Sequence, residues 1–184
     1  FRKQFLWTVS AKAEVLDLPA GVAAGLDGHG VLDAQAHELV AAARRSGEAV
    51  TISSSLVTSM RGARNVLRSG SVVSYLQDFE VEIAQASNIG NPVFLDVFTG
   101  TQLALSAGLA PDGRAAQFDV DFTHTELPTP MQRLSTAHGE IELPELGIFQ
   151  LRTGFRAPFG STVLVGSWAH EGRRRLLLLT PVLR

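Results

Sequence analysis

Residues 97–120, VFTGTQLALSAGLAPDGRAAQFDV, and residues 153–184, TGFRAPFGSTVLVGSWAHEGRRRLLLLTPVLR, decide the fold class of this chain. In the first stretch, apolar and polar residues alternate on both sides of Pro111-Asp112-Gly113. Successive strand residues point to opposite faces and a Pro-Asp-Gly run favours a turn, so this stretch predicts a β-hairpin with one wet face. Both stretches join strands through a glycine-marked turn, which indicates a β-assembly module rather than an enzyme.

The N-terminal part, residues 1–48, predicts a strand followed by a helix. Apolar residues alternate from Phe5 to Val15, and the strand stops at Pro19. After a glycine-rich loop, Asp33 is a suitable N-cap for a helix from Ala34 to Arg45, with Gly47 as the stop signal.

Residues 49–184 predict mainly β-hairpins, with no separate second domain. We expect a short buried strand over 49–52, a strand over 64–67 that ends in a turn at Ser69-Gly70, and a turn over 88–92. Between the turns, residues 71–85 alternate cleanly, and one face carries the acidic side chains of Asp78, Glu80 and Glu82. A proline-marked connection through Pro128 and Pro130 then leads to closing strands over 148–157, 161–168 and 174–182. The predicted fold class is therefore mainly β with one N-terminal helix.

Composition limits the classes of function. With 184 residues, 45% of them hydrophobic and 18% charged, the chain is long enough and apolar enough for a real core. A net charge of -2 provides no global field for binding nucleic acid. The chain has no cysteine, which excludes disulfides and thiol chemistry, and no run of about 20 apolar residues for a membrane helix. Because it begins at Phe1 and runs directly into a strand pattern, we expect a mature or trimmed chain.

Residues that could support catalysis or metal binding are sparse. The five histidines lack metal-ligand spacing, and His124, near Asp121 and Glu126, is the best of them. Asp119 and Asp121 share a strand face, as paired catalytic carboxylates would, but alternating acids are more often a wet face. There is no G-x-S-x-G elbow and no phosphate-binding loop, so we expect no enzyme activity, no metal and no cofactor.

Two further features allow more than one interpretation. The cluster Arg173-Arg174-Arg175 is suited to lipid head groups, phosphate or an acidic neighbour, but protection of a strand edge is the favoured interpretation. Trp7 and Trp168 are either interfacial residues of a barrel or, more often, packing residues.

The order of the predicted elements resembles the C-terminal domain of bacterial secretins, the multimeric outer-membrane pores of type II and type III secretion and type IV pilus systems. The similarity runs from about Trp7 to the end of the chain. It depends on residues that match family motifs: Gly100 with Leu103 and Leu105, the Pro111-Asp112-Gly113 turn, Gly160 and Gly166 around the penultimate strand, and the closing Thr180-Pro181. The chain departs from the family at Ser167, where secretins usually carry a second glycine.

The resemblance implies antiparallel hairpins that form part of a multimeric, double-walled β-barrel. It implies a homo-oligomeric ring in the bacterial outer membrane or periplasm, membrane contact, and docking to other envelope or secretion-system proteins. The aqueous lumen would be lined by one of two acidic faces, that of Asp78, Glu80 and Glu82 or that of Asp119 and Asp121. Ring closure would also pair strand edges that otherwise promote aggregation. The alternative is a soluble β-sandwich with a binding or structural role and no pore activity.

Overall fold

The computed structural model describes residues 8–26, 30–60, 62–84 and 87–183, and only the backbone of 82–84, 87–89 and 183. These residues form two compact units. Unit 1 contains the described parts of 1–67, 103–122 and 151–184, and unit 2 contains the described parts of 68–102 and 123–150. The predicted division at residue 48 stays a prediction.

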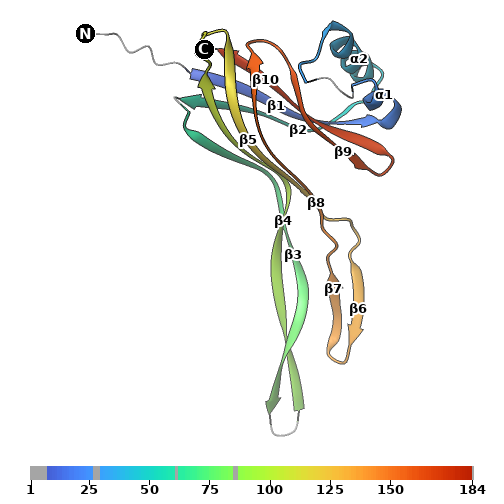
Figure 1. The fold of residues 1–184 in the computed structure, drawn as a ribbon. Helices are drawn as coiled ribbons and strands as arrows, with labels where there is room; N and C mark the ends of the chain where they lie inside the picture. Colours follow the sequence, from blue (N-terminus) through green and yellow to red (C-terminus); the bar gives the residue numbers. More distant parts are fainter. Residues whose placement is uncertain (1–7, 27–29, 61, 85–86, 184) are drawn as a thin grey trace, which may run out of the picture. The chain divides into compact units, whose positions relative to one another are not determined.

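The strands of the described residues form two four-stranded sheets and one separate β-hairpin (Figure 1). The first sheet has the order β2-β1-β10-β9, with bounds Val50–Met60, Thr8–Pro19, Arg173–Leu183 and Val163–His170. The second has the order β3-β4-β5-β8, with bounds Arg64–Ala84, Ser87–Leu109, Ala115–Glu126 and Gly147–Pro158. The separate hairpin pairs β6 (Gln132–Thr136) with β7 (Gly139–Leu143).

Strands β1 and β10 are the two central strands of the first sheet and bury most of their apolar side chains. One face of β1 buries alternate residues from Val9 to Val15, and the last two of them, Ala13 and Val15, pair with the LLLL run of β10. After a register shift at Val15/Leu16, Leu16 and Leu18 join Leu176 and Leu178 in a cluster with the helices. Central strands that are covered on both sides are expected to be continuously apolar.

Helices α1 (Ala20–Ala24) and α2 (Ala34–Arg45) cover one face of the first sheet. The predicted cap of α2 is confirmed, because the Asp33 carboxylate accepts the backbone N–H of Ala36 at 2.8 Å. Ala36, Val40 and Ala43 form the buried side of α2. Helix α1 was not predicted, since Gly21 inside it and Gly25 at its end indicate a loop.

The part of the second sheet that belongs to unit 1 packs against the first sheet. Phe118, Val120 and Phe122 of β5 are buried, as the alternation predicted. The ring of Phe122 lies 6.0 Å from that of Trp168 in β9, so Trp168 is a packing residue. Phe155 of β8 lies 5.4 Å from Phe118, which places its ring in the same core. Trp7, with residues 1–7, lies outside the described part of the chain.

The structure corrects several predicted boundaries. Strand β2 continues through the serine run to Met60, and its residues Val50 and Ile52 are exposed rather than buried. No turn interrupts β3 at Ser69-Gly70 or β4 at residues 88–92, because both strands run continuously through these positions. The proline-marked connection contains the β6–β7 hairpin, which the sequence analysis missed. The hairpin around Pro111-Asp112-Gly113 and the three closing strands are confirmed.

Candidate functional site

The closing Thr180-Pro181 and the glycines before it have structural roles in unit 1. The Thr180 hydroxyl lies 2.8 Å from that of Thr162, and the carbonyl of buried Pro181 accepts the backbone N–H of Gly160 at 2.8 Å. Gly160 has φ 78°, which favours glycine in this turn. Gly166 pairs with Leu177 next to a register shift in the β9–β10 ladder. These four residues fix how β9 returns along β10.

The residues Pro111-Asp112-Gly113 form the turn between β4 and β5 that the sequence predicts. Gly113 has φ 70°, and the backbone N–H of Ala110 donates to Ala115 at 2.9 Å. The backbone N–H of Arg114 lowers the pKa of Asp112 below its ordinary 3.8, and the Arg156 guanidinium, which is paired with this carboxylate, lowers it further. Leu103 and Leu105, which precede the turn, are buried in the core of unit 1.

Asp119 and Asp121 lie on the polar face of β5, on the opposite side from buried Phe118 and Val120. Asp121 accepts a hydrogen bond from Arg64 of β3 at 3.1 Å. Both carboxylates and Arg64 line a small hollow with Arg152 of β8. This face of unit 1 is therefore a mixed-charge surface across neighbouring strands, with arginines beside the predicted acidic pair.

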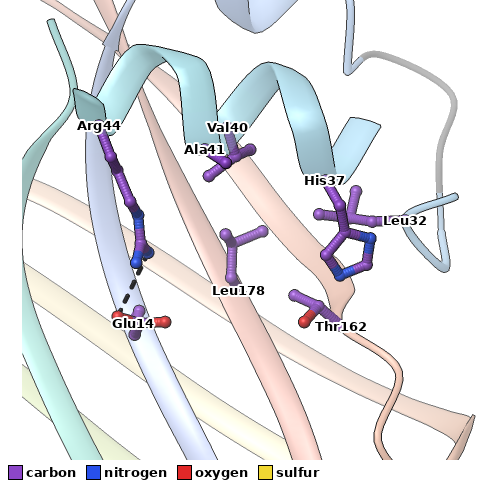
Figure 2. Close-up of a pocket in the computed structure, with 8 residues that line it drawn as sticks. All are labelled: Glu14, Leu32, His37, Val40, Ala41, Arg44, Thr162 and Leu178. Atoms are coloured by element: carbon purple, nitrogen blue, oxygen red, sulfur yellow. Dashed lines mark ion pairs between the residues drawn. The ribbon is translucent and has the colours of Figure 1, made fainter. Parts of the chain in front are cut away.

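A cavity of about 200 Å³ lies between helix α2 and the first sheet. Figure 2 shows the residues that line it. Its charged end is Glu14 of β1, whose carboxylate lies 3.0 Å from Lys12 Nζ and 3.3 Å from Arg44 of the helix. Its other end is formed by Leu32, Thr162 and His37. The Glu14–Arg44 pair ties the helix to the sheet, so a structural role accounts for these contacts.

The arginine cluster of β10 binds an acidic neighbour. Arg173 Nε donates to Asp17 Oδ1 at 2.5 Å, and Arg175 Nε lies 3.5 Å from Asp17 Oδ2. Asp17 and Arg175 are both buried. Strand β10 lies inside its sheet, so the favoured interpretation of edge protection is wrong. A buried arginine–carboxylate pair is costly to break because one charge would remain buried without compensation.

In unit 2, β3 and β4 approach each other unusually closely at Gly70 and Gly100. A Cβ at Gly70 would lie 2.0 Å from the carbonyl oxygen of Thr99, and a Cβ at Gly100 would lie 2.3 Å from that of Ser69. Gly100 also has φ 132°, a backbone conformation that L side chains rarely adopt. The glycine of the family motif is therefore required by backbone contact, and its partner is Gly70, which was misread as a turn residue.

A pocket of about 460 Å³ lies beside this close approach of β3 and β4 and is lined by Gly70, Gly100, His124 and Glu126. His124 is buried, and its Nε2 lies 3.2 Å from Glu126 Oε1. Asp121, in unit 1, pairs with Arg64. Among the residues that the structure describes, no group of three or more His, Asp or Glu side chains is positioned to hold a metal ion.

Unit 2 is strongly acidic. The sequence of 68–102 and 123–150 contains two basic residues, both arginine, and eight Asp or Glu residues, a net charge of -6. Asp78 and Glu80 are exposed on β3, as predicted, while the side chain of Glu82 lies outside the described residues. The helices within the described ranges are too short or too polar to cross a membrane.

The arrangement of elements is similar to that of solved secretins. The secretin-domain β-barrel of InvG from the Salmonella SPI-1 injectisome aligns over 97% of this chain and 61% of its own, with 14% identity and a TM-score of 0.51. The chain has the fold of a secretin β-barrel domain. The type II secretin GspD of E. coli K12 aligns with a TM-score of 0.45 and 9% identity, over 97% of this chain and 49% of its own. The V. cholerae competence pilus secretin PilQ is similar at 0.43, with 11% identity, over 97% of this chain and 59% of its own.

The likeness is one of fold and not of sequence. No protein-family model matches the sequence. No curated protein is significantly similar to it. The chain spans about 61% of the InvG chain to which it aligns. The predicted fold class is confirmed, and the secretin resemblance that was based on short motifs is confirmed at the level of the fold.

Sequence reasoning found some of these positions and missed others. It selected Gly100 and the Pro111-Asp112-Gly113 turn, which the structure places at special backbone positions. It missed Gly70, because a Ser-Gly pair is a common turn signal, and the buried Asp17, because nothing in the sequence pairs it with residues 156 or more positions away. Whether the family-motif and lumen residues act as assigned in a pore stays a prediction.

Proposed function

We propose that this chain is a subunit of a homo-oligomeric secretin-like ring in the bacterial outer membrane or periplasm, with a role in transport or envelope architecture and without catalysis. The observation that carries the proposal is that both four-stranded sheets, as far as the described residues go, end in edge strands that pair with no further strand over most of their length; the Val31–Val163 bridge covers part of β9. The edges are β2 and β9 in the first sheet and β3 and β8 in the second. Open edges of this length favour pairing with another copy.

Neighbouring copies would close both sheets into walls of a shared barrel. In a head-to-tail ring, β3 of one copy meets β8 of the next, and β2 meets β9. The two sheets of unit 1 would then become two concentric walls, consistent with the double-walled barrel implied by the resemblance. The InvG structure that supports this fold is a secretin-domain β-barrel from an injectisome.

The proposal also assigns the lining of the lumen. The polar face of β5 with Asp119 and Asp121, and the exposed Asp78 and Glu80 of β3, are the faces suited to water. Membrane contact and docking to other envelope proteins belong to the proposal and need their own tests.

Cysteine cross-linking tests the ring directly, because the chain has no native cysteine. Val66 of β3 and Arg152 of β8 are exposed on opposite edge strands. The double variant Val66→Cys/Arg152→Cys, treated with a short bismaleimide after gentle extraction, should give a ladder of covalent multimers. Each single variant has one reactive site and should stop at dimers. A double variant that also stops at monomers and dimers would contradict head-to-tail pairing of β3 with β8 and support the soluble sandwich.

A further inference from the structure

Residues 30–32 cover one end of the edge strand β9 in unit 1. Val31 forms an antiparallel bridge with Val163, the first residue of β9. Two backbone hydrogen bonds of 2.8 Å flank the bridge, from the N–H of Leu32 to the carbonyl of Thr162 and from the N–H of Leu164 to the carbonyl of Gly30. They occupy backbone groups through which a further strand would otherwise pair with this end of β9.

Both sides of the bridge are fixed by contacts within unit 1. Leu32 is buried in the apolar cluster beneath helix α2, and Asp33 caps that helix through the backbone N–H of Ala36. On the strand side, the hydroxyl of Thr162 lies 2.8 Å from that of Thr180 in β10. Residues 30–32 are therefore held on β9 by more than the two hydrogen bonds of the bridge.

The ladder between β9 and β10 is irregular directly after the covered end. Leu164 pairs with Leu178 and Gly166 with Leu177, so Val165 is an extra residue on the β9 side. This is the pattern of a β-bulge, a feature that ends or redirects pairing at sheet edges. The regular edge of β9 thus runs over residues 166–170, up to the end of the strand at His170.

A strand that docks on this edge has to match its two faces. Trp168 faces the core, because its ring lies 6.0 Å from that of Phe122, and Ala169 is exposed on the other face. In β2, Val57 is buried and Leu56 is exposed. Directly opposite residues share a face, and a slip by one residue exchanges the faces. Trp168 therefore lies opposite Val57 or one of the alternate neighbours of Val57 in β2.

We propose that residues 30–32 are an edge stop, which sets the register at which β2 of a second copy docks on β9. The proposal rests on the proposed ring, in which β2 of one copy meets β9 of the next. Every neighbouring pair in the first sheet is antiparallel, so a ring that continues this pattern places β2 antiparallel to β9. The last residue of β2, Met60, then points toward the edge stop, and the strand ends opposite Val165.

The edge stop leaves one register that uses the whole regular edge. A slip of two residues toward the stop would place Met60 opposite Val163, a position that Val31 already occupies. A slip of two residues away from the stop would leave Gly166 without an opposite residue in β2. The remaining register pairs all of residues 166–170 and keeps the stop in place. In this register Val57 of one copy faces Trp168 of the other.

Disulfide mapping measures the register, because the chain has no native cysteine. In the proposed register, Leu56→Cys/Ala169→Cys puts the two thiols on directly opposite residues of the exposed face. Leu56→Cys/Ser167→Cys and Thr58→Cys/Ala169→Cys are the matched variants, which report the slips of two residues toward and away from the stop. Opposite Cβ atoms lie about 4.5–5.5 Å apart and displaced ones about 7–8 Å, against about 3.5–4.5 Å in a disulfide. Under mild oxidation of gently extracted complexes, the first variant should form intermolecular disulfides severalfold faster than the other two.

A second variant tests whether the edge stop stays on β9 when a copy docks. Val31→Cys/Val163→Cys joins the two residues of the bridge within one copy, and its disulfide is detected by peptide mass spectrometry. The oxidised and reduced forms should give the same yield of rings, because docking does not displace the stop. Loss of rings on oxidation would overturn the proposal, since residues 30–32 would then have to leave β9 for the second copy.

The mapping also separates this proposal from the ring itself. Equal rates for the three intermolecular pairs, or a faster rate for either slipped pair, would overturn the edge stop. If Val66→Cys/Arg152→Cys gives a ladder of multimers and none of the three pairs cross-links, the ring stands and the edge stop is refuted. If neither experiment gives multimers, the ring proposal fails, and the edge stop fails with it.

Discussion

Gly100→Ala is expected to disrupt the close approach of β3 and β4 at Gly70 and Gly100 in unit 2. The new Cβ would lie 2.3 Å from the Ser69 carbonyl oxygen and 2.6 Å from Gly70 Cα, well inside the 3.4 Å at which ordinary van der Waals contact begins. Both obstacles are backbone atoms, so no side-chain rotation relieves the overlap. The variant must move one strand away from the other.

The magnitude combines two effects. A non-glycine residue held at φ 132° costs about 1–3 kcal/mol. Overpacking against fixed atoms costs about another 1–3 kcal/mol. The local free energy of opening should therefore fall by about 2–6 kcal/mol, and a loss of 2 kcal/mol alone raises amide exchange about 30-fold.

Hydrogen–deuterium exchange measured by mass spectrometry gives the readout, on peptides that cover 68–76 and 96–102. Gly108→Ala is the matched control, because Gly108 lies in the same strand β4, a Cβ added there would meet no atom within 4 Å, and its φ is not unusual. Alanine at such a site is neutral or stabilising by about 0.4–1 kcal/mol. Equal exchange in the two variants would refute the claim that the close approach of β3 and β4 requires glycine at residue 100.

Three other substitutions test the remaining structural assignments. Asp17→Asn should destabilise unit 1 by about 3–5 kcal/mol in urea titration, because it removes the buried negative charge that Arg173 and Arg175 contact. Glu38→Gln, in the exposed pair with Arg45, should cost less than about 1 kcal/mol, and similar values for both variants would contradict a buried pair. Asp33→Ala should lower helix stability by about 1 kcal/mol through loss of the cap, seen as faster exchange at Ala36, and unchanged exchange would argue against the cap. The pKa of Asp112 in the folded chain lies below 3.8, so its charge contributes fully to the free energy of unfolding above the unfolded pKa. That contribution is lost as pH falls through the folded pKa, and the stabilities of Asp112→Asn and the parent chain should therefore converge as pH falls below about 4. A stability difference that widens below that pH would contradict the lowered pKa.

Alternation predicted the strands that bury one face, and failed where strands are exposed or covered on both faces. The β5 residues Phe118, Val120 and Phe122 were predicted correctly because their polar neighbours face water. β2 was predicted too short, since its serines carry no apolar signal and its pairing with β1 comes from tertiary contact. β6 and β7 were missed for the same reason: their side chains are exposed or half-buried, so their sequence carries no alternating apolar signal.

Glycine has two different structural roles in this chain, and the neighbouring residues in the sequence do not distinguish between them. At Gly113 it marks a turn with positive φ, as predicted. At Gly70 it lies inside a strand, where the absence of a side chain lets the facing backbone approach. The partner that creates this requirement is 30 residues away at Gly100 and becomes visible only in the folded chain.

The central claim, that this chain closes its sheets by pairing with copies of itself, is tested most directly by its native mass. Complexes extracted gently from cell envelopes in detergent should be weighed by mass photometry and imaged as single particles. The account predicts closed rings of many copies, with a mass that is a whole multiple of the mass of one subunit. A homogeneous monomer or dimer, with no rings in the images, would contradict it.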